Sequence, residues 1–227
     1  MSGASDMLAL RIDDLTIRYP GLSAPALHIP TLEIAAGERI ALTGPSGSGK
    51  TTLINCITGM EHVPAGRLMW NGENLSGLVE ARRDRWRLRN VGLVMQDFHL
   101  FPGLSAEANV LLPQRLAHLR LHRDIRVRAL DLLRAVGIER PDQPVQTMSR
   151  GQMQRVAVAR ALIAQPGVIV ADEPTASLDA ESGAMVADLL TALSIKSGAT
   201  LIVATHDQRL IARLDRVMRL DGGRIAG

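Results

Sequence analysis

A run of eight residues, 44–51, has the composition and spacing of a loop that binds phosphate groups. It reads Gly-Pro-Ser-Gly-Ser-Gly-Lys-Thr and fits the pattern G-x-x-x-x-G-K-[ST]. Glycines let backbone N–H groups close around phosphate oxygens without a Cβ atom in the way. The Lys50 ammonium can offset the charge of the β- and γ-phosphates, and the Thr51 hydroxyl can bind Mg²⁺. The pattern predicts that a nucleotide is bound by Gly44, Pro45, Ser46, Gly47, Ser48, Gly49, Lys50, Thr51 and Thr52.

The residues on either side of this loop can hold it in place. Residues 39–43 form a short apolar run that predicts a buried strand, and residues 52–58 predict a helix. The N-terminus of that helix would direct the positive end of its dipole at the phosphates. Because strand, loop and helix occur in this order, an accidental glycine-rich turn is a poor explanation of the match.

Polar residues also follow three other apolar runs of the chain. Gln96 and His206 each follow one, and the pair Asp172 and Glu173 follows a third at residues 168–171. Such runs are typical of strands buried on both faces of a parallel sheet. Ligands of open α/β sheets bind beyond the carboxyl ends of the strands. Each residue alone could be an ordinary solvated strand end, but in this order, behind a phosphate loop, they predict phosphoryl chemistry.

A further segment, residues 148–162, begins with small polar residues and continues as a helix rich in Ala and Val. Ser149 has the position of a helix N-cap. One interpretation is a capped core helix. The other is a second anion site at a helix N-terminus, with the Ser149 hydroxyl and the Gly151 N–H directed at phosphate.

Composition indicates an ordinary globular domain. The chain has 227 residues, 46% hydrophobic and 22% charged, with a net charge of +3, which gives little support to a nucleic-acid partner. A single cysteine, Cys56, excludes an intramolecular disulfide and fits a reducing compartment. No apolar run approaches the 18 residues or more of a membrane-spanning helix.

The order of apolar patterns predicts an α/β fold. Residues 8–43 alternate as strands, and residues 166–220 alternate strand, helix, strand, helix, strand. Between them, an arginine-rich helix is expected around residues 81–89. Residues 97–165 are expected to be mostly helical and to form a second lobe, with breaks at Pro102, Pro113, Pro141 and Pro144.

In these residues the chain resembles the ATP-binding subunit of ABC transporters over nearly its whole length. Six ordered motifs carry the resemblance: the Walker A region at 43–52, the Q-loop at Gln96, the signature (usually L-S-G-G-Q) at 149–152, Walker B with its glutamate at 168–173, the D-loop at 177–179 and the switch histidine at His206. Tyr19, the only tyrosine, lies where the family keeps an aromatic ring that stacks on adenine.

The resemblance implies a P-loop NTPase core with a parallel sheet, an N-terminal antiparallel β subdomain and an inserted α-helical lobe at about 97–165. Residues 1–227 would form one ATP-binding domain. The resemblance also implies that Glu173 polarises the attacking water and that His206 stabilises charge on the γ-phosphate. Gln96 would respond to the presence of the γ-phosphate. The implied Mg²⁺ ligands are Thr51, Gln96 and Asp172, and ATP is the implied nucleotide.

The resemblance also implies a head-to-tail dimer with two ATP molecules between the subunits. Ser149, Gly151 and Gln152 would cover the ATP held by the other subunit, and Asp179 would cross the interface. The other implied partner is an integral membrane permease on a separate chain, docked in a groove near residues 98–110. The subunit would then be cytoplasmic and peripheral on the inner face of the cell membrane.

Within the family, residues 95–105 and 109–113 are similar to the subgroup for lipoprotein release, macrolide efflux and cell division. Two residues depart from the family signature, because Arg150 replaces its first glycine and Met148 its leucine. The Arg150 guanidinium could point to solvent or reach the phosphate on the opposite subunit. We expect it to point to solvent, since Ser149 and Gly151 already supply the family's donors.

Other functions remain open at this point. A soluble ABC-type ATPase acting on DNA or ribosomes would carry a long coiled coil or a second such domain, and neither is present. An importer subunit is a further alternative, whereas a P-loop kinase would not need residues 149–152 or 177–179.

The arginine run 82–89 is either a solvated helix face or a contact for anionic lipid. His118 and His122 are expected on the surface, without a third metal ligand.

Overall fold

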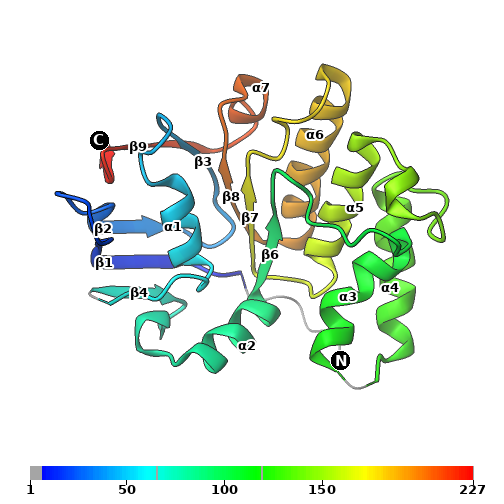
Figure 1. Cartoon of the computed structure of the whole chain (residues 1–227), viewed down its shortest axis with the longest axis horizontal. Coiled ribbons are helices and arrows are strands. Elements are labelled where there is room, and N and C mark those ends of the chain that lie inside the picture. Colours follow the sequence, from blue (N-terminus) through cyan, green and yellow to red (C-terminus); the bar gives the residue numbers. More distant parts are fainter. Residues whose placement is uncertain (1–6, 65, 119, 227) are drawn as a thin grey trace.

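A six-stranded sheet forms the centre of the computed structural model, which describes residues 7–64, 66–118 and 120–226 (Figure 1). The strands lie in the order β10-β9-β3-β8-β7-β6, all parallel except β10, which pairs antiparallel with β9. Their bounds are β3 Arg39–Thr43, β6 Val91–Val94, β7 Val168–Asp172, β8 Thr200–Ala204, β9 Arg216–Asp221 and β10 Arg224–Ala226. The carboxyl ends of β3, β6, β7 and β8 therefore meet at one edge of the sheet.

Helices cover both faces of this sheet, as continuous apolar strands require. Along β7, Val168 and Val170 pack with helix α1 (Lys50–Ile57) on one face. Ile169 and Ala171 pack on the other face with α5 (Arg150–Leu162) and α6 (Ala180–Ser197). A short helix, α7 (Gln208–Ile211), follows β8. The prediction that residues 168–171 and 201–204 are strands buried on both faces is confirmed.

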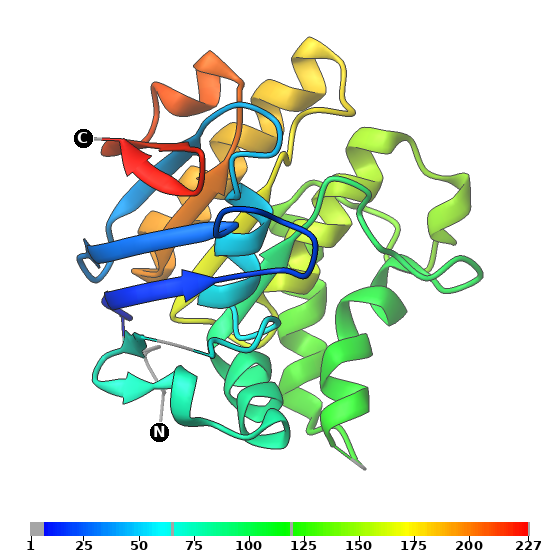
Figure 2. The ribbon, with the colours of Figure 1, turned by 60° about the vertical axis from the view of Figure 1, so that its left-hand side comes forward.

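A second, antiparallel sheet lies over α1 on the side away from the lobe (Figure 2). Its order is β2-β1-β4-β5, with bounds β1 Leu10–Ile17, β2 Leu27–Ile34, β4 Arg67–Trp70 and β5 Glu73–Asn74. Leu10, Ile12, Leu15 and Ile17 of β1 are buried in the same core cluster as α1. The Trp70 indole donates a 2.8 Å hydrogen bond to the carbonyl of Ile57, at the end of α1. This subdomain therefore fixes α1, the helix that follows the phosphate loop.

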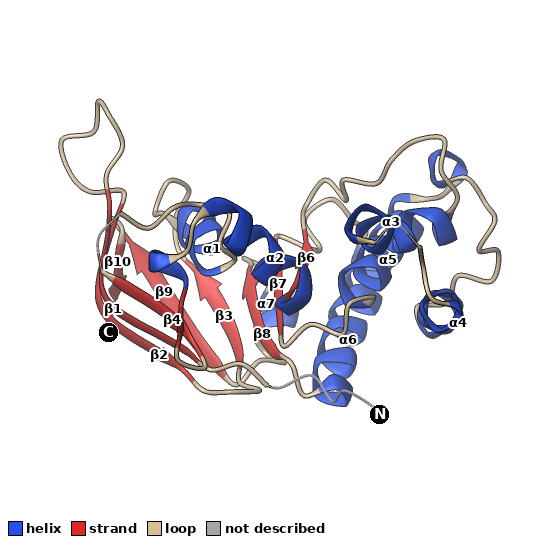
Figure 3. Ribbon diagram, turned by 90° about the horizontal axis from the view of Figure 1, so that it is seen from below, coloured by secondary structure: helices blue, strands red, loops and turns tan. Residues whose placement is uncertain are grey.

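The arginine-rich helix and the helical lobe complete the fold. After the short η1 (Leu75–Gly77), α2 (Glu80–Asn90) leads into β6. The lobe contains α3 (Ala106–Ala117), α4 (Arg123–Ala135) and η2 (Val145–Thr147), which pack against one side of α5 (Figure 3). Helix α5 also packs on the central sheet, so one rigid helix joins lobe and core.

The predicted fold class is confirmed, and one expected break is wrong. Pro113 lies inside α3 and does not end it. A proline lacks the N–H that would bond to residue 109 and normally kinks a helix. Here the side chain of Asn109 is buried and bonds to Phe101, and α3 packs along α4 and α5. This packing holds the helix through the missing hydrogen bond.

The expected domain bounds, 1–227, include residues 1–6, 65, 119 and 227, which lie outside the described residues. Among the helices of the described ranges, none has the length and apolar character needed to cross a bilayer.

Candidate functional site

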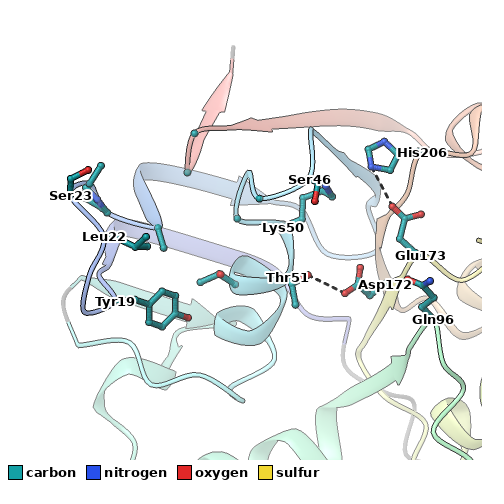
Figure 4. Close-up of a pocket in the computed structure, with 18 residues that line it drawn as sticks. Tyr19, Leu22, Ser23, Ser46, Lys50, Thr51, Gln96, Asp172, Glu173 and His206 are labelled. Atoms are coloured by element: carbon teal, nitrogen blue, oxygen red, sulfur yellow. Dashed lines mark hydrogen bonds and ion pairs between the residues drawn. The ribbon is translucent and has the colours of Figure 1, made fainter.

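A cavity of about 710 Å³ opens at the carboxyl edge of the central sheet (Figure 4). Residues from six separate stretches of sequence line it. Those predicted from the sequence are Tyr19, Ser46, Gly47, Gly49, Lys50, Thr51, Thr52, Gln96, Asp172, Glu173 and His206. The fold thus brings together residues as distant in sequence as Tyr19 and His206.

The phosphate loop takes a backbone path that only glycine permits at two positions. Gly44 has φ +146°, and a Cβ atom there would lie 2.0 Å from the carbonyl oxygen of Leu220. Gly49 has φ +102°, and a Cβ atom would lie 2.9 Å from the carbonyl of Ala26. The loop is therefore pressed against β9 and the β1–β2 loop, which fixes its curvature. Pro45 belongs to the same loop, where its carbonyl accepts from Lys50.

The charged end of Lys50 lies in the concave side of this loop. Its ammonium donates to the carbonyls of Gly44 at 2.7 Å and Pro45 at 3.1 Å. An ammonium carries three donors, so two of them orient the group and one remains for an anion. Thr51 lies in the first turn of α1, and its hydroxyl donates to Asp172 Oδ2 at 3.4 Å.

Glu173 follows β7 in an unusual backbone conformation. Its φ is +45°, the left-handed region that non-glycine residues rarely adopt. Its N–H donates to the carbonyl of Ala204 at 2.8 Å, which holds the residue beside the end of β8. Its carboxylate lies 3.5 Å from Nε2 of His206 (Figure 4). Strain of this kind is found where a side chain must be aimed at a reaction.

Burial raises the pKa of both carboxyl groups at this edge. For Asp172, the hydrogen bond from Thr51 and the charge of Lys50 partly oppose the effect of burial. For Glu173, the main cause is again burial, partly opposed by His206. A carboxylate held where its charged form is costly is a better proton acceptor than a solvated one.

The cavity has a polar end and an aromatic end (Figure 4). Gln96 lies at the polar end, exposed just after β6 and near Asp172. Tyr19 lies at the opposite end, in the loop after β1, with 37% of its surface exposed. The Tyr19 phenol is neutral at physiological pH, as for any tyrosine, and burial raises its pKa further. A neutral exposed ring is suited to stacking on a purine base.

The donor set fits a nucleotide and a magnesium ion. Ser48 of the loop is buried, its hydroxyl has no hydrogen-bond partner, and it does not line the cavity. Thr51 and Gln96 offer neutral oxygen ligands and Asp172 a carboxylate, and Mg²⁺ prefers a few such oxygens together with phosphates. His118 and His122 are exposed as expected. Within the described ranges, no three His, Cys, Asp or Glu residues gather as a metal site.

A second group of predicted residues lies outside the cavity. Ser149 caps α5: its hydroxyl accepts from the N–H of Gln152, whose side chain accepts from the N–H of Ser149. Asp179 caps α6, and hydrogen bonds from the backbone and side chain of Ser182 lower its pKa. Gly151 lies between these helix ends. The structure therefore does not bring this group to the phosphate loop of its own chain.

Arg150 is exposed, as expected, and its guanidinium also contacts two residues of its own subunit. Its Nε donates to the carbonyl of Ser177 at 3.0 Å, and its guanidinium lies 5.2 Å from the centre of the Phe98 ring. A cation directly at a helix N-terminus is unfavourable. The guanidinium accordingly turns to a carbonyl oxygen and an aromatic face of its own subunit.

Several residues that line the cavity were not predicted from the sequence, because they match no motif. Residues 22–26 of the β1–β2 loop and Gly222 and Gly223 of the β9–β10 turn line it. Gly223 donates from its N–H to the carbonyl of Ser48 and accepts from the N–H of His28. These turns read as ordinary connections in the sequence, because only the tertiary fold brings them against the phosphate loop.

Comparisons with known proteins agree with this geometry. The model of the family described as ABC transporter matches residues 27–176. The lipoprotein-releasing system ATP-binding protein LolD 2 of Rhodospirillum rubrum is 42% identical over 91% of this chain and 90% of its own length. The corresponding LolD protein of Chromohalobacter salexigens is 40% identical over 98% of this chain and 95% of its own.

Solved structures with the same fold include the ATP-binding cassette MJ0796, in a dimer bound to ADP and Pi. It aligns with a TM-score of 0.86 at 32% identity, covering 96% of this chain and 97% of that one. CbiO1 of Clostridium perfringens, part of an ABC transporter complex, aligns with a TM-score of 0.84 at 30% identity, over 98% and 88%. This chain therefore belongs to the ABC transporter family, as an ATP-binding subunit that hydrolyses ATP with Mg²⁺.

Proposed function

We propose that this subunit forms a head-to-tail dimer around two ATP molecules and powers a membrane permease of the lipoprotein-release and efflux type. Residues 1–227 would act as one ATP-binding domain, with a helical lobe at about 97–165. The observation that carries the proposal is the division of the site. Phosphate-binding and acid–base residues share one cavity, while Ser149, Gly151, Gln152 and Asp179 lie outside it.

In this proposal, the phosphate loop holds the ATP phosphates with its backbone N–H groups and with Lys50. Glu173 accepts a proton from the attacking water, since its carboxylate is partly desolvated and lies at the cavity wall. His206, beside it, donates a hydrogen bond to the γ-phosphate. Thr51, Gln96 and Asp172 would hold Mg²⁺, which would supply compensation of the phosphate charge. Phosphoryl transfer needs mainly this positioning and charge compensation.

The second subunit would supply what one cavity lacks. The N-terminus of α5 is exposed at its N-cap Ser149, and Gly151 behind it is buried against Ser182. A helix N-terminus binds anions, and the only nucleotide it can meet is one held by another subunit. The dimeric cassette MJ0796, with ADP and Pi, supports this arrangement. Asp179, exposed at the start of α6, would lie at the same interface.

The permease would dock beside Gln96, on the loop that joins β6 to the helical lobe. Phe98 and Val110, at the limits of the expected groove, are buried, but Phe101 between them is 54% exposed. We propose that Phe101 contributes to the docking surface and that the subunit is peripheral on the cytoplasmic face of the membrane. The LolD relatives favour lipoprotein release over efflux or import.

The test is to express the chain with and without an integral membrane permease of the lipoprotein-release type. We expect the chain to be recovered with membranes, and its ATP hydrolysis to respond to a lipidated protein, only when both are present. Phe101→Ser should reduce membrane recovery without changing the ATP affinity of the isolated subunit. Equal recovery in the absence of any membrane partner would contradict the proposal.

A further inference from the structure

Arg150 is in an electrostatically unfavourable place, and its contacts connect three segments of the site. It is the first residue of α5, where the helix dipole repels a cation and no acidic residue lies in the first turn. Helix α5 lies beside both β6 and α6 (Figure 1). The guanidinium compensates by binding the Ser177 carbonyl and the face of Phe98.

The Phe98 contact leads to Gln96. Phe98 is buried, has φ +59°, and donates from its N–H to the carbonyl of Met95, which closes a tight turn around Gln96. Arg160, at the other end of α5, donates to the carbonyls of Phe98 and His99. Two arginines from opposite ends of α5 thus hold the turn that carries Gln96. Arg150 contacts the Phe98 ring, and Arg160 binds the backbone carbonyls of Phe98 and His99.

The Ser177 contact leads to Asp179. Ser177 lies two residues before Asp179, which caps α6 by accepting from the N–H groups of Glu181 and Ser182. The N-termini of α5 and α6 touch, because a Cβ atom on Gly151 would lie 2.7 Å from the Ser182 hydroxyl. Arg150 therefore spans the two helix ends that carry the residues outside the cavity.

We propose that Arg150 is a positioning residue that makes the α5 N-terminus, the Gln96 turn and the Asp179 loop move as one unit. Since the first and third segments would face the ATP of the second subunit, loss of Arg150 weakens closure of the dimer. The α5 N-terminus and the Asp179 loop do not line the cavity of their own subunit, so nucleotide binding by the separate subunit depends on Arg150 only through the Gln96 turn and changes less than dimer closure. This inference rests on the proposed dimer.

The experiment uses the full chain carrying Glu173→Gln, so that hydrolysis does not reopen the dimer. Light scattering gives the ATP concentration for half-maximal dimerisation, and calorimetry at low protein concentration gives the affinity of the monomer. Arg150→Gln should raise the half-maximal ATP concentration about fivefold or more, since a charged hydrogen bond and a cation–π contact are lost. Arg150→Lys should give an intermediate value, because an ammonium can still lie over the ring.

Phe98→Leu tests whether Arg150 acts through its contact with the Phe98 ring. In that background Arg150→Gln should add little, since the ring it acts on is gone. The matched control is Arg134→Gln, which removes an exposed arginine paired with Asp131 in the same lobe and should have no effect. Melting temperature, measured for every variant, separates positioning from loss of fold.

The outcomes are distinct. If the Glu173→Gln background stays monomeric at saturating Mg-ATP, the proposed dimer is wrong and this inference is wrong with it. If that background dimerises but Arg150→Gln does so at the same ATP concentration, only the inference is overturned. Fully additive effects of Arg150→Gln and Phe98→Leu would also overturn it.

Discussion

His206 Nε2 lies 3.5 Å from Glu173 Oε1, although the two residues follow different strands of the central sheet. Strands β7 and β8 are parallel neighbours, so their carboxyl ends lie side by side. The imidazole is mostly exposed and the carboxylate mostly buried, with 60% and 20% of their side-chain surfaces accessible. The pair is therefore asymmetric: the exposed His206 lowers the pKa of the more buried Glu173.

This asymmetry predicts a pH dependence. Burial raises the pKa of Glu173 and His206 lowers it in part. Hydrolysis should fall as the pH drops through this raised pKa, at a higher pH than an ordinary glutamate would give. His206→Ala removes the opposing influence, so the acid limb of the kcat profile should move to still higher pH. An unmoved or lowered acid limb would contradict the assigned coupling.

Lys50→Ala should weaken ATP binding about a hundredfold or more, because charge-assisted hydrogen bonds contribute roughly 1.5–3 kcal/mol each. Calorimetry on the isolated subunit measures this directly. Lys196→Ala is the matched control, since Lys196 is the only other lysine and lies in the last turn of α6. Near-normal affinity in Lys50→Ala would refute the interpretation of the phosphate loop.

Tyr19→Ala should weaken nucleotide binding by about 1–3 kcal/mol, the range for stacking of a base on an aromatic ring. ATP and GTP should be affected alike, since both purines present a π face. Tyr19→Phe keeps the ring and should bind nearly normally. If Tyr19→Ala lost affinity for ATP but not for GTP, the side chain would be reading the base edge instead of stacking.

Gly44→Ala should destabilise the fold by about 3 kcal/mol or more, because the new Cβ atom would overlap the Leu220 carbonyl. Gly21→Ala is the control: Gly21 also has a positive φ, +86°, but no atom lies within 4 Å of the added carbon. We expect about 1–2 kcal/mol there, from backbone strain alone. Urea denaturation compares the two, and equal losses would contradict the close approach of the loop to β9.

Much of this architecture could be predicted because its signals are local. The phosphate loop is contiguous, and the apolar runs at 168–171 and 201–204 are unbroken, so both are legible without the fold. The continuation of α3 through Pro113 was not predictable, since it depends on the buried side chain of Asn109 and on packing against α5. Local rules describe an isolated helix, and tertiary contacts override them here.

The same distinction holds in the site. Glu173, His206 and Gln96 were predictable because each follows a strand, and the edge of a parallel sheet gathers strand ends. The contacts of Arg150 were not, since its partners, Ser177 and Phe98, lie 27 and 52 positions away in sequence. Gly223 was missed for the same reason, because its contact with Ser48 exists only in the folded chain.

The most direct test of the account is the association state of the Glu173→Gln subunit in Mg-ATP, measured by light scattering with and without Ser149→Arg. We expect a stable dimer for the first protein. We expect a monomer for the double variant, with unchanged ATP affinity, because Ser149 would meet only the nucleotide of the other subunit. If Ser149→Arg left the dimer intact, or if it abolished ATP binding by the single subunit, the divided site proposed here would be wrong.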